Sequence, residues 1–295
     1  MARGLGAAAR VSNARKDRAI GALLGLAVGD AVGTTVEFKP RDSFAPMTDM
    51  VGGGPFGLKP GEWTDDMSMA LCLADSLIAT GGALDPANLL AQFVNWYRLG
   101  WNSVTGHCFD IGNATRAALE AFEAHGSTLN NAAEGMQANG SIMRLAPAVI
   151  CAASETQAVD LARAQGRTTH AASVPDRCCA ELARDLWAAI ETGQPPATVL
   201  ALGARDRRSI VSTGHAPATL EAARWAVATT TDFRQAVLAA ANLGDDADTV
   251  GAVAGQIAGA LYGASGIPPE WLERLAWRAQ IEQRAEALWM LRTKR

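Results

Sequence analysis

The sequence has few of the residues that serve enzymes as nucleophiles or as soft metal ligands. Its four histidines are scattered, and its five cysteines are odd in number and show no metal-ligand spacing. It also lacks a Gly-x-Ser-x-Gly motif, a Walker loop and a His-Glu-x-x-His motif. Zinc chemistry and the familiar nucleophile mechanisms are therefore disfavoured, and any reaction must depend on carboxylates and hard cations.

Long apolar runs and alternating patterns are missing as well. The run 19–29 is too short to cross a bilayer and Asp30 ends it, so we expect no membrane span. No segment alternates at period two over the length of a strand. A formal charge of −4 disfavours a duplex-binding surface, so no nucleic-acid partner is expected. The cysteines are interpreted as buried reduced thiols of a cytoplasmic protein.

The first residues contain no acidic side chain. Arg3, Arg10 and Arg15 are set among alanines in the stretch 1–16. This composition is compatible with a transit peptide, but it lacks the apolar region of a secretory signal. We favour a disordered N-terminal tail over residues 1–16, followed by one domain over residues 17–295.

What the chain does have is helical periodicity and two glycine ridges. Each ridge places a glycine at every fourth position, at Gly21, Gly25, Gly29 and Gly33 and again at Gly251, Gly255, Gly259 and Gly263. A glycine inside a helix costs about 1 kcal/mol relative to alanine, so the ridges need a packing reason. We expect these helices to lie against each other at the centre of a single compact, orthogonal, all-α domain. The helices are expected at residues 17–34, 65–78, 86–99, 113–124, 156–165, 175–192, 217–229, 233–241, 250–263, 269–277 and 281–291.

Two acidic turns precede helices that lie far apart in the sequence. Thr64-Asp65-Asp66 and Gly244-Asp245-Asp246-Ala247-Asp248-Thr249 each run directly into an apolar segment. One interpretation is a pair of acidic N-caps, which are common at helix starts. The other is a shared cation site, because paired carboxylates and threonine hydroxyls are hard oxygen donors. The recurrence of the pattern favours the cation site.

Further polar segments lie between these turns. Glu37 follows the first ridge and precedes a Gly- and Pro-rich segment over residues 39–62. Loops of this length are typical of lids or binding loops, although an idle surface excursion is the alternative. Asn139-Gly140-Ser141 precedes an apolar segment over residues 142–150. It is either a phosphate-binding turn or an ordinary serine N-cap.

Five ordered motifs resemble the ADP-ribosylglycohydrolase family. They are Gly25-Leu26-Ala27-Val28-Gly29-Asp30-Ala31-Val32-Gly33 with Glu37, Thr64-Asp65-Asp66, Asp110-Ile111-Gly112-Asn113, Asn139-Gly140-Ser141-Ile142-Met143-Arg144, and the turn 244–249. The resemblance covers roughly residues 17–271. It implies an all-α fold with a central dinuclear-metal cleft that holds two divalent cations, Mg²⁺ or Mn²⁺.

The resemblance also implies a role for individual residues. The implied metal ligands are Thr64, Asp65, Asp66, Asp246, Asp248 and Thr249. Glu37 would lie over the cleft and Asp110 close to the reacting ribose, with Asn113 in the same substrate-binding motif. The residues expected at the diphosphate are Asn139, Gly140 and Ser141. His170 resembles a histidine beside the distal nucleotide, and His215 stands where many relatives have an adenine-stacking tyrosine.

Two departures qualify this transfer. An imidazole at His215 stacks less extensively than a phenol, which leaves the affinity for the distal base open. Asp245 replaces a glycine found in some members, and we expect its carboxylate to face water rather than to add a hydrogen bond in the site.

The chemistry fits a glycosidic hydrolase. Two hard cations can clamp the cis-diol of a ribose, and carboxylates stabilise the oxocarbenium-like state of glycosidic cleavage. We hypothesise that a carboxylate among Glu37 and Asp110 handles the proton and that the metals and Asp65 place the water. The expected substrate is ADP-ribose on arginine of a modified protein, or a small ADP-ribosyl compound, and the enzyme is expected to be monomeric.

Two alternatives stay open at this point. One is a dinuclear phosphohydrolase of a nucleotide-sugar diphosphate, and the other is a non-catalytic ADP-ribose-binding or structural relative. Product analysis separates the two enzymes, because glycosidic cleavage yields ADP-ribose whereas attack at phosphorus yields AMP. Absence of Mg²⁺ or Mn²⁺ binding would favour the non-catalytic alternative.

Overall fold

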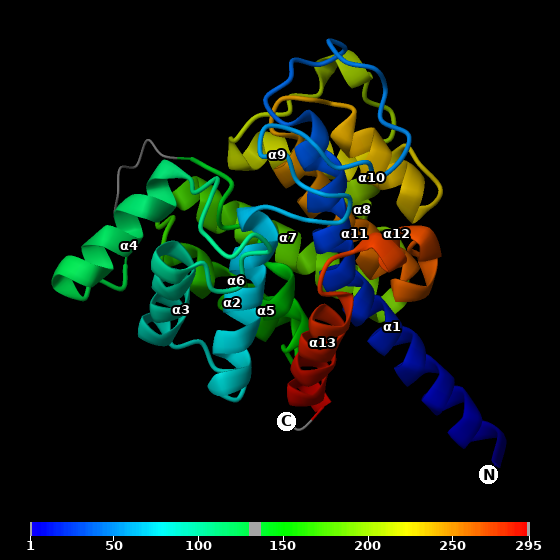
Figure 1. Cartoon of the computed structure of the whole chain (residues 1–295). Helices are drawn as coiled ribbons and strands as arrows, with labels where there is room; N and C mark the ends of the chain where they lie inside the picture. The colour runs from blue at the N-terminus through cyan, green and yellow to red at the C-terminus, as the bar shows by residue number, and fades with distance from the viewer. Residues whose placement is uncertain (1, 130–136, 294–295) are drawn as a thin grey trace.

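Helices α1 (Ala2–Gly33) and α11 (Ala247–Tyr262) form the centre of the computed structural model, which describes residues 2–129 and 137–293 (Figure 1). They run antiparallel, and their backbones touch along the two glycine ridges. A β-carbon on Gly25 would lie 2.1 Å from the carbonyl oxygen of Gly255, far inside van der Waals contact. Gly21 faces Gly259 and Gly29 faces Gly251 in the same way. The predicted contact between the two ridges at the centre of the domain is confirmed.

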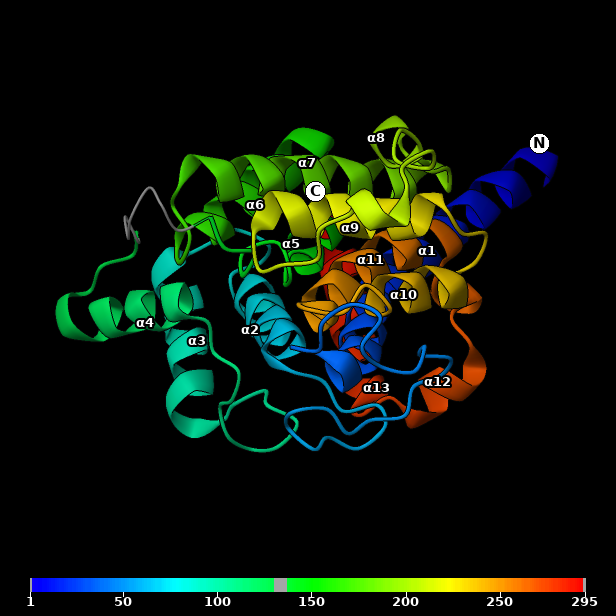
Figure 2. The same ribbon diagram turned by 90° about the horizontal axis from the view of Figure 1, so that it is seen from above.

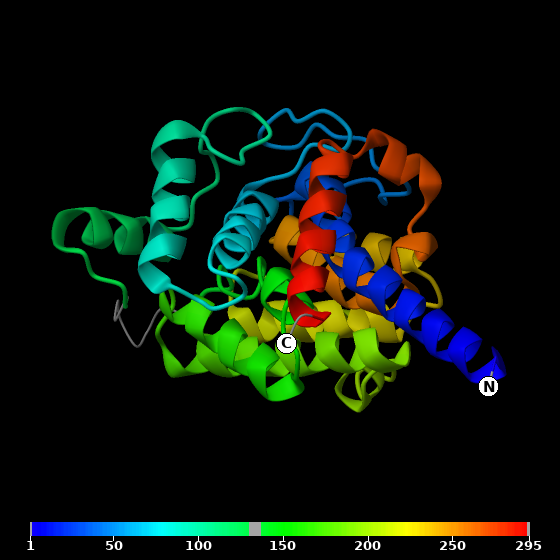
Figure 3. The same ribbon diagram turned by 90° about the horizontal axis from the view of Figure 1, so that it is seen from below.

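The other helices surround this central pair. Helices α7, α9 and α10 pack against α11, and α13 packs against both α1 and α2 (Figures 2 and 3). Helix α3 packs against α2, and α4 packs against α3 and projects from one side of the molecule (Figure 2). Besides α1 and α11, the elements are η1 (Thr34–Val36), α2 (Asp65–Ala79), α3 (Pro86–Leu99), α4 (Asn113–His125), α5 (Ala146–Ile150), α6 (Glu155–Arg167), α7 (Ser173–Thr192), α8 (Ala197–Leu200), η2 (Arg207–Ser209), α9 (Ala216–Ala228), α10 (Phe233–Ala241), η3 (Ala264–Gly266), α12 (Pro269–Arg274) and α13 (Arg278–Thr293).

Within the described ranges the fold is entirely helical. The only extended pairings there are isolated bridges between Gly53 and Leu58 and between Ala138 and His215. The predicted all-α class and single compact domain are confirmed.

Local signals explain many helix ends, and several boundaries differ from the predictions by one to three residues, with a larger difference at the start of α1. Asp85 caps α3 by accepting hydrogen bonds from the amides of Ala87 and Asn88, and Gly100 ends the helix in the left-handed region. The helix expected to run to residue 277 ends at Arg274. Trp277 then adopts a positive φ of 53°, and α13 begins directly after it. A bulky side chain in that region is a steric outlier that periodicity does not reveal.

Helix α1 begins within the predicted tail. Its first residue is Ala2, and near the end of that stretch Arg15 and Lys16 form ion pairs with Glu191 and Glu286. The division of the chain between residues 16 and 17 stays a prediction.

The segment Val11–Val36 is long and apolar enough to cross a membrane by length and composition alone, which the sequence analysis did not anticipate. Within its most apolar window, 94% is buried inside the protein. The core packing of α1 against α11 accounts for that apolar character.

The segment over residues 39–62 is pinned to the helices rather than free. Arg41 donates hydrogen bonds to the carbonyl oxygens of Leu243, Arg207 and Ile210. Farther along, Asp49 accepts from the indole of Trp271 at 2.5 Å and from Arg274 at 2.8 Å. These anchors tie the segment to η2 (Arg207–Ser209), to the end of α10 and to α12.

Candidate active site

The two acidic turns meet between α2 and α11. The Thr64 hydroxyl donates to Asp248 at 3.4 Å, and the Thr249 hydroxyl donates to Asp66 at 3.3 Å. Asp65, Asp66 and Asp248 each offer a carboxylate oxygen, and these oxygens lie within 4.8 Å of one another. All three side chains are buried. The structure therefore brings together residues from turns that lie far apart in the sequence.

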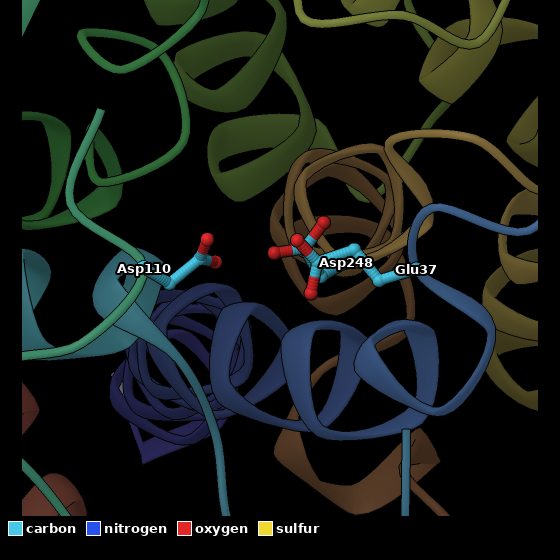
Figure 4. A group of neighbouring side chains, drawn as sticks. All are labelled: Glu37, Asp110 and Asp248. Atoms are coloured by element: carbon cyan, nitrogen blue, oxygen red, sulfur yellow. The ribbon is translucent and has the colours of Figure 1, made fainter. Parts of the chain in front are cut away.

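A second acidic group shares Asp248 with the first. Glu37, Asp110 and Asp248 also present oxygens within 4.8 Å of one another. Figure 4 shows Asp110 pointing from its loop toward Glu37 and Asp248. Asp110 adopts a positive φ of 56°, and its carboxyl shares hydrogen bonds with Asp65 and Glu37. Asp248 thus connects both groups.

Asp30 is a site residue that the sequence analysis did not identify. It is fully buried on α1 and accepts hydrogen bonds from the Thr64 amide at 2.9 Å, the Thr64 hydroxyl at 3.0 Å and the Met67 amide at 3.1 Å. A carboxylate from another helix thus caps the N-terminus of α2, where free amides favour negative charge. The signal available in the sequence is a lone acid inside an apolar, glycine-rich helix.

Backbone pairing holds Glu37 beside the second acidic turn. The Phe38 amide donates to the carbonyl of Asp245 at 2.7 Å, and the Asp245 amide donates to the carbonyl of Lys39 at 2.8 Å. Asp245 itself is exposed with a positive φ of 53°, so the expectation that its carboxylate faces water is confirmed. Asp246, the next residue, accepts a hydrogen bond from the Asn139 side chain at 2.5 Å.

A cavity of about 160 Å³ opens above these carboxylates. Among the predicted site residues, the cavity wall includes Glu37, Asp65, Asp110, Asn113, Asn139, Gly140, His170, Asp246, Asp248 and Thr249. Thr64 and Asp66 lie beneath them, fully buried.

Two predicted substrate-binding residues do not line this cavity. The Ser141 side chain is fully buried near Gly166 and Cys179. His215 is exposed at the N-cap of α9, and its imidazole pairs with Gln137 at 2.7 Å. Their assignment to substrate binding stays a prediction.

The carboxylates are electrostatically crowded. Burial, followed by the charges of Asp110 and Asp246, raises the pKa of Glu37 to about 9. Burial likewise raises the pKa of Asp30 and Asp110 to about 7 and that of Asp246 to about 6. The pKa values of the deepest three acids, Asp65, Asp66 and Asp248, are also raised by burial and by neighbouring carboxylates.

The donor set fits divalent cations. One carboxylate oxygen on Asp66 and one on Asp248 are buried without a hydrogen-bond partner among the described residues. Such orphaned buried oxygens are costly unless a cation or a proton satisfies them. Carboxylates and hydroxyls without histidine or cysteine suit Mg²⁺ or Mn²⁺.

Arg144 organises the far wall of the cavity and was also missed as a site residue. It is fully buried, and it donates hydrogen bonds to the Gly140 carbonyl at 2.8 Å, to Gln165 at 2.9 Å and to the Thr169 hydroxyl at 2.7 Å. Thr169 in turn contacts the imidazole of His170 at 2.8 Å. Burial and the nearby Arg144 lower the pKa of His170 to about 3, so this wall presents a neutral imidazole.

Comparison with known proteins shows to which family this chain belongs. The family model described as ADP-ribosylglycohydrolase matches residues 11–295. The chain belongs to the ADP-ribosylglycohydrolase family. The resemblance carried by the five motifs is confirmed, and so is the prediction of a hydrolase.

Relatives of this ADP-ribosylglycohydrolase are similar over most of their length. It is 48% identical to the ADP-ribosylarginine hydrolase Tri1 of Pseudomonas putida, over 92% of this chain and 78% of that protein. It is 34% identical to the ADP-ribosyl-[dinitrogen reductase] glycohydrolase of Rhodospirillum rubrum, over 92% of this chain and 94% of that protein. A solved ADP-ribosylglycohydrolase-related protein complex aligns with a TM-score of 0.82 at 39% identity, covering 95% of this chain and 99% of that chain.

Proposed function

We propose that this ADP-ribosylglycohydrolase hydrolyses the bond between ADP-ribose and an arginine side chain of a modified protein, with two divalent cations as cofactors. The observation that carries the proposal is the pair of acidic groups that share Asp248 on the floor of one cavity. The arginine linkage is supported by the similarity to proteins named ADP-ribosylarginine hydrolases.

The cations would be held by the acidic turns. Their proposed ligands are Thr64, Asp65, Asp66, Asp246, Asp248 and Thr249, which the fold gathers between α2 and α11. When bound, Mg²⁺ or Mn²⁺ would supply the positive charge that orients the two ribose hydroxyls.

The protein's own groups provide the acid–base chemistry. Hydrolysis forms a bond between a water oxygen and the anomeric carbon, breaks the bond to the guanidine nitrogen, and delivers a proton to that nitrogen. Glu37 and Asp110 face this region from opposite loops, so we assign the proton transfer to them. We assign the orientation of the water to Asp65, whose carboxyl lies beside that of Asp110.

The opposite wall would bind the remainder of the substrate. Asn139 and Gly140 line the cavity beside His170 and are proposed to meet the diphosphate, with His170 next to the distal nucleoside. A β-carbon on Gly140 would lie 2.7 Å from the His170 ring, so the wall has no room for a larger residue there.

Mass spectrometry of peptides tests this proposal. A peptide ADP-ribosylated on arginine and one ADP-ribosylated on serine are incubated with the protein and Mn²⁺. Release of ADP-ribose from the arginine peptide supports the proposal, whereas AMP as the product identifies a phosphohydrolase. Asp110→Asn is expected to lower kcat at least 100-fold, and Asp160→Asn, an exposed acid on α6, serves as the matched control.

The remaining expectations are proposals too. The thiols of Cys72, Cys108, Cys178 and Cys179 form no disulfide in the described part of the chain, which supports our proposal of a reducing compartment such as the cytoplasm. We propose a monomer that acts without a nucleic-acid partner, and light scattering of the purified protein tests its oligomeric state.

A further inference from the structure

Aromatic rings from separate segments gather beside the two carboxylates at the cavity. Phe38 lies 6.4 Å from Phe56, and Phe56 lies 5.0 Å from Phe109, measured between ring centroids. His107 continues the row at 6.0 Å from Phe109. We call these four residues the aromatic rim. Its members come from the end of η1, the pinned segment over residues 39–62, and the loop before α4.

Two residues of the rim are sequence neighbours of the proposed acid–base residues. Phe38 follows Glu37 and Phe109 precedes Asp110, so each proposed catalytic carboxylate has a rim ring as its chain neighbour. Phe38 also lines the cavity together with these two acids. One ring of the rim, that of Phe38, therefore lies at the cavity that contains the proposed acid–base residues.

Phe38 is held in a position that exposes its ring. Its backbone has a positive φ of 61°, which is sterically unfavourable for a bulky residue. The hydrogen bond from its amide to the Asp245 carbonyl fixes this conformation. Phe38 is 64% exposed, so the fold holds an apolar residue in water at the mouth of a charged cavity. Such backbone strain is typical of ligand-binding positions.

We propose that the aromatic rim binds the arginine guanidinium of the acceptor, a proposal that rests on the proposed function. A planar cation is attracted to the faces of aromatic rings. A neutral serine acceptor lacks this attraction. The rim thus selects guanidinium-linked ADP-ribose, and it contributes little to the binding of ADP-ribose itself.

Leucine substitutions remove the π-face and keep the apolar bulk. Phe38→Leu and Phe109→Leu are each expected to raise KM for an ADP-ribosylarginine peptide roughly two- to fivefold, as an exposed cation–π contact implies. The inhibition constant of free ADP-ribose is expected to stay unchanged. Phe38→Tyr keeps an aromatic face and is expected to preserve KM. Val51→Ala, an exposed apolar residue of the same pinned segment, is the matched control.

The outcomes separate this proposal from the proposed function. A wild-type protein that releases no ADP-ribose from the arginine peptide overturns both. An active wild type whose leucine variants keep their KM overturns the rim proposal alone. Equal weakening of the peptide and of ADP-ribose also overturns it, since the rings would then contact the nucleotide.

Discussion

The Thr249 hydroxyl on α11 donates a hydrogen bond to the Asp66 carboxylate on α2 at 3.3 Å, although the two residues are 183 positions apart in the sequence. This contact shows directly that the two acidic helix starts share one site. Both helices are placed by α1, which packs along α11 through glycines and caps α2 through Asp30. The packing of the core and the geometry of the site are therefore linked.

Divalent cations are expected to stabilise the protein more at high pH than at low pH. The folded-state pKa values of Asp110, about 7, and Glu37, about 9, lie above their ordinary values. The metal-free fold therefore loses stability as pH rises from about 4 through these values, because the unfolded chain releases its protons first. Cations would offset the negative charge that these carboxylates acquire inside the cavity.

Thermal unfolding measures this effect. Mn²⁺ at about 100 times its Kd at pH 8 is expected to raise Tm by about 5 °C at that pH, and the same concentration is expected to raise Tm by less at pH 6. Asp248→Asn is expected to abolish the increase. An increase that is equal at both pH values would contradict cation binding next to Glu37 and Asp110.

Gly25→Ala is expected to destabilise the fold strongly. The added β-carbon would meet the Gly255 carbonyl oxygen at 2.1 Å, so α1 and α11 must separate. Urea unfolding is expected to show a loss of about 3 kcal/mol or more, as strong overpacking produces. Gly203→Ala is the control, since its nearest neighbour would lie at 3.4 Å. Equal stability of the two variants would refute close helix contact.

Asp30→Asn is expected to weaken both the fold and cation binding. Asn offers one carbonyl oxygen in place of the two that accept hydrogen bonds from Thr64 and Met67. Its NH₂ group would face a backbone donor, at a cost of about 1–3 kcal/mol. Chemical unfolding and calorimetry with Mn²⁺ check the two effects, with Asp160→Asn as the control. A variant that keeps both stability and affinity would show that Asp30 has no positioning role.

His170 is expected to remain neutral throughout the active pH range. Its pKa of about 3 follows from burial and from the nearby Arg144 guanidinium. An NMR titration of the ring should show no protonation above pH 5. A midpoint near 6.5 would mean that the imidazole is more hydrated than the structure shows.

Local sequence features predicted much of the fold. The glycine spacing predicted the contact between α1 and α11, and the paired acids at two helix starts predicted their convergence. Both patterns destabilise the protein unless a further interaction compensates. Glycines weaken a helix unless another helix packs closely on them, and crowded carboxylates repel one another unless a cation binds between them.

Other features depend on tertiary contacts that no local pattern encodes. Asp30 and Arg144 are fully buried charges, and their roles become visible only with their partners in place. The aromatic rim joins Phe38, Phe56 and Phe109 from segments with no common periodicity. Ser141 belongs to a recognisable motif, but its side chain is buried in the core. A motif alone therefore does not reveal which of its polar residues face the cavity.

Anomalous diffraction from crystals grown with Mn²⁺ tests the central claim most directly. The acidic turns are predicted to give two strong manganese peaks in the cavity among Asp65, Asp66, Asp246 and Asp248. An enzyme that is active in the same Mn²⁺ solution, yet shows no manganese between α2 and α11, would contradict this account.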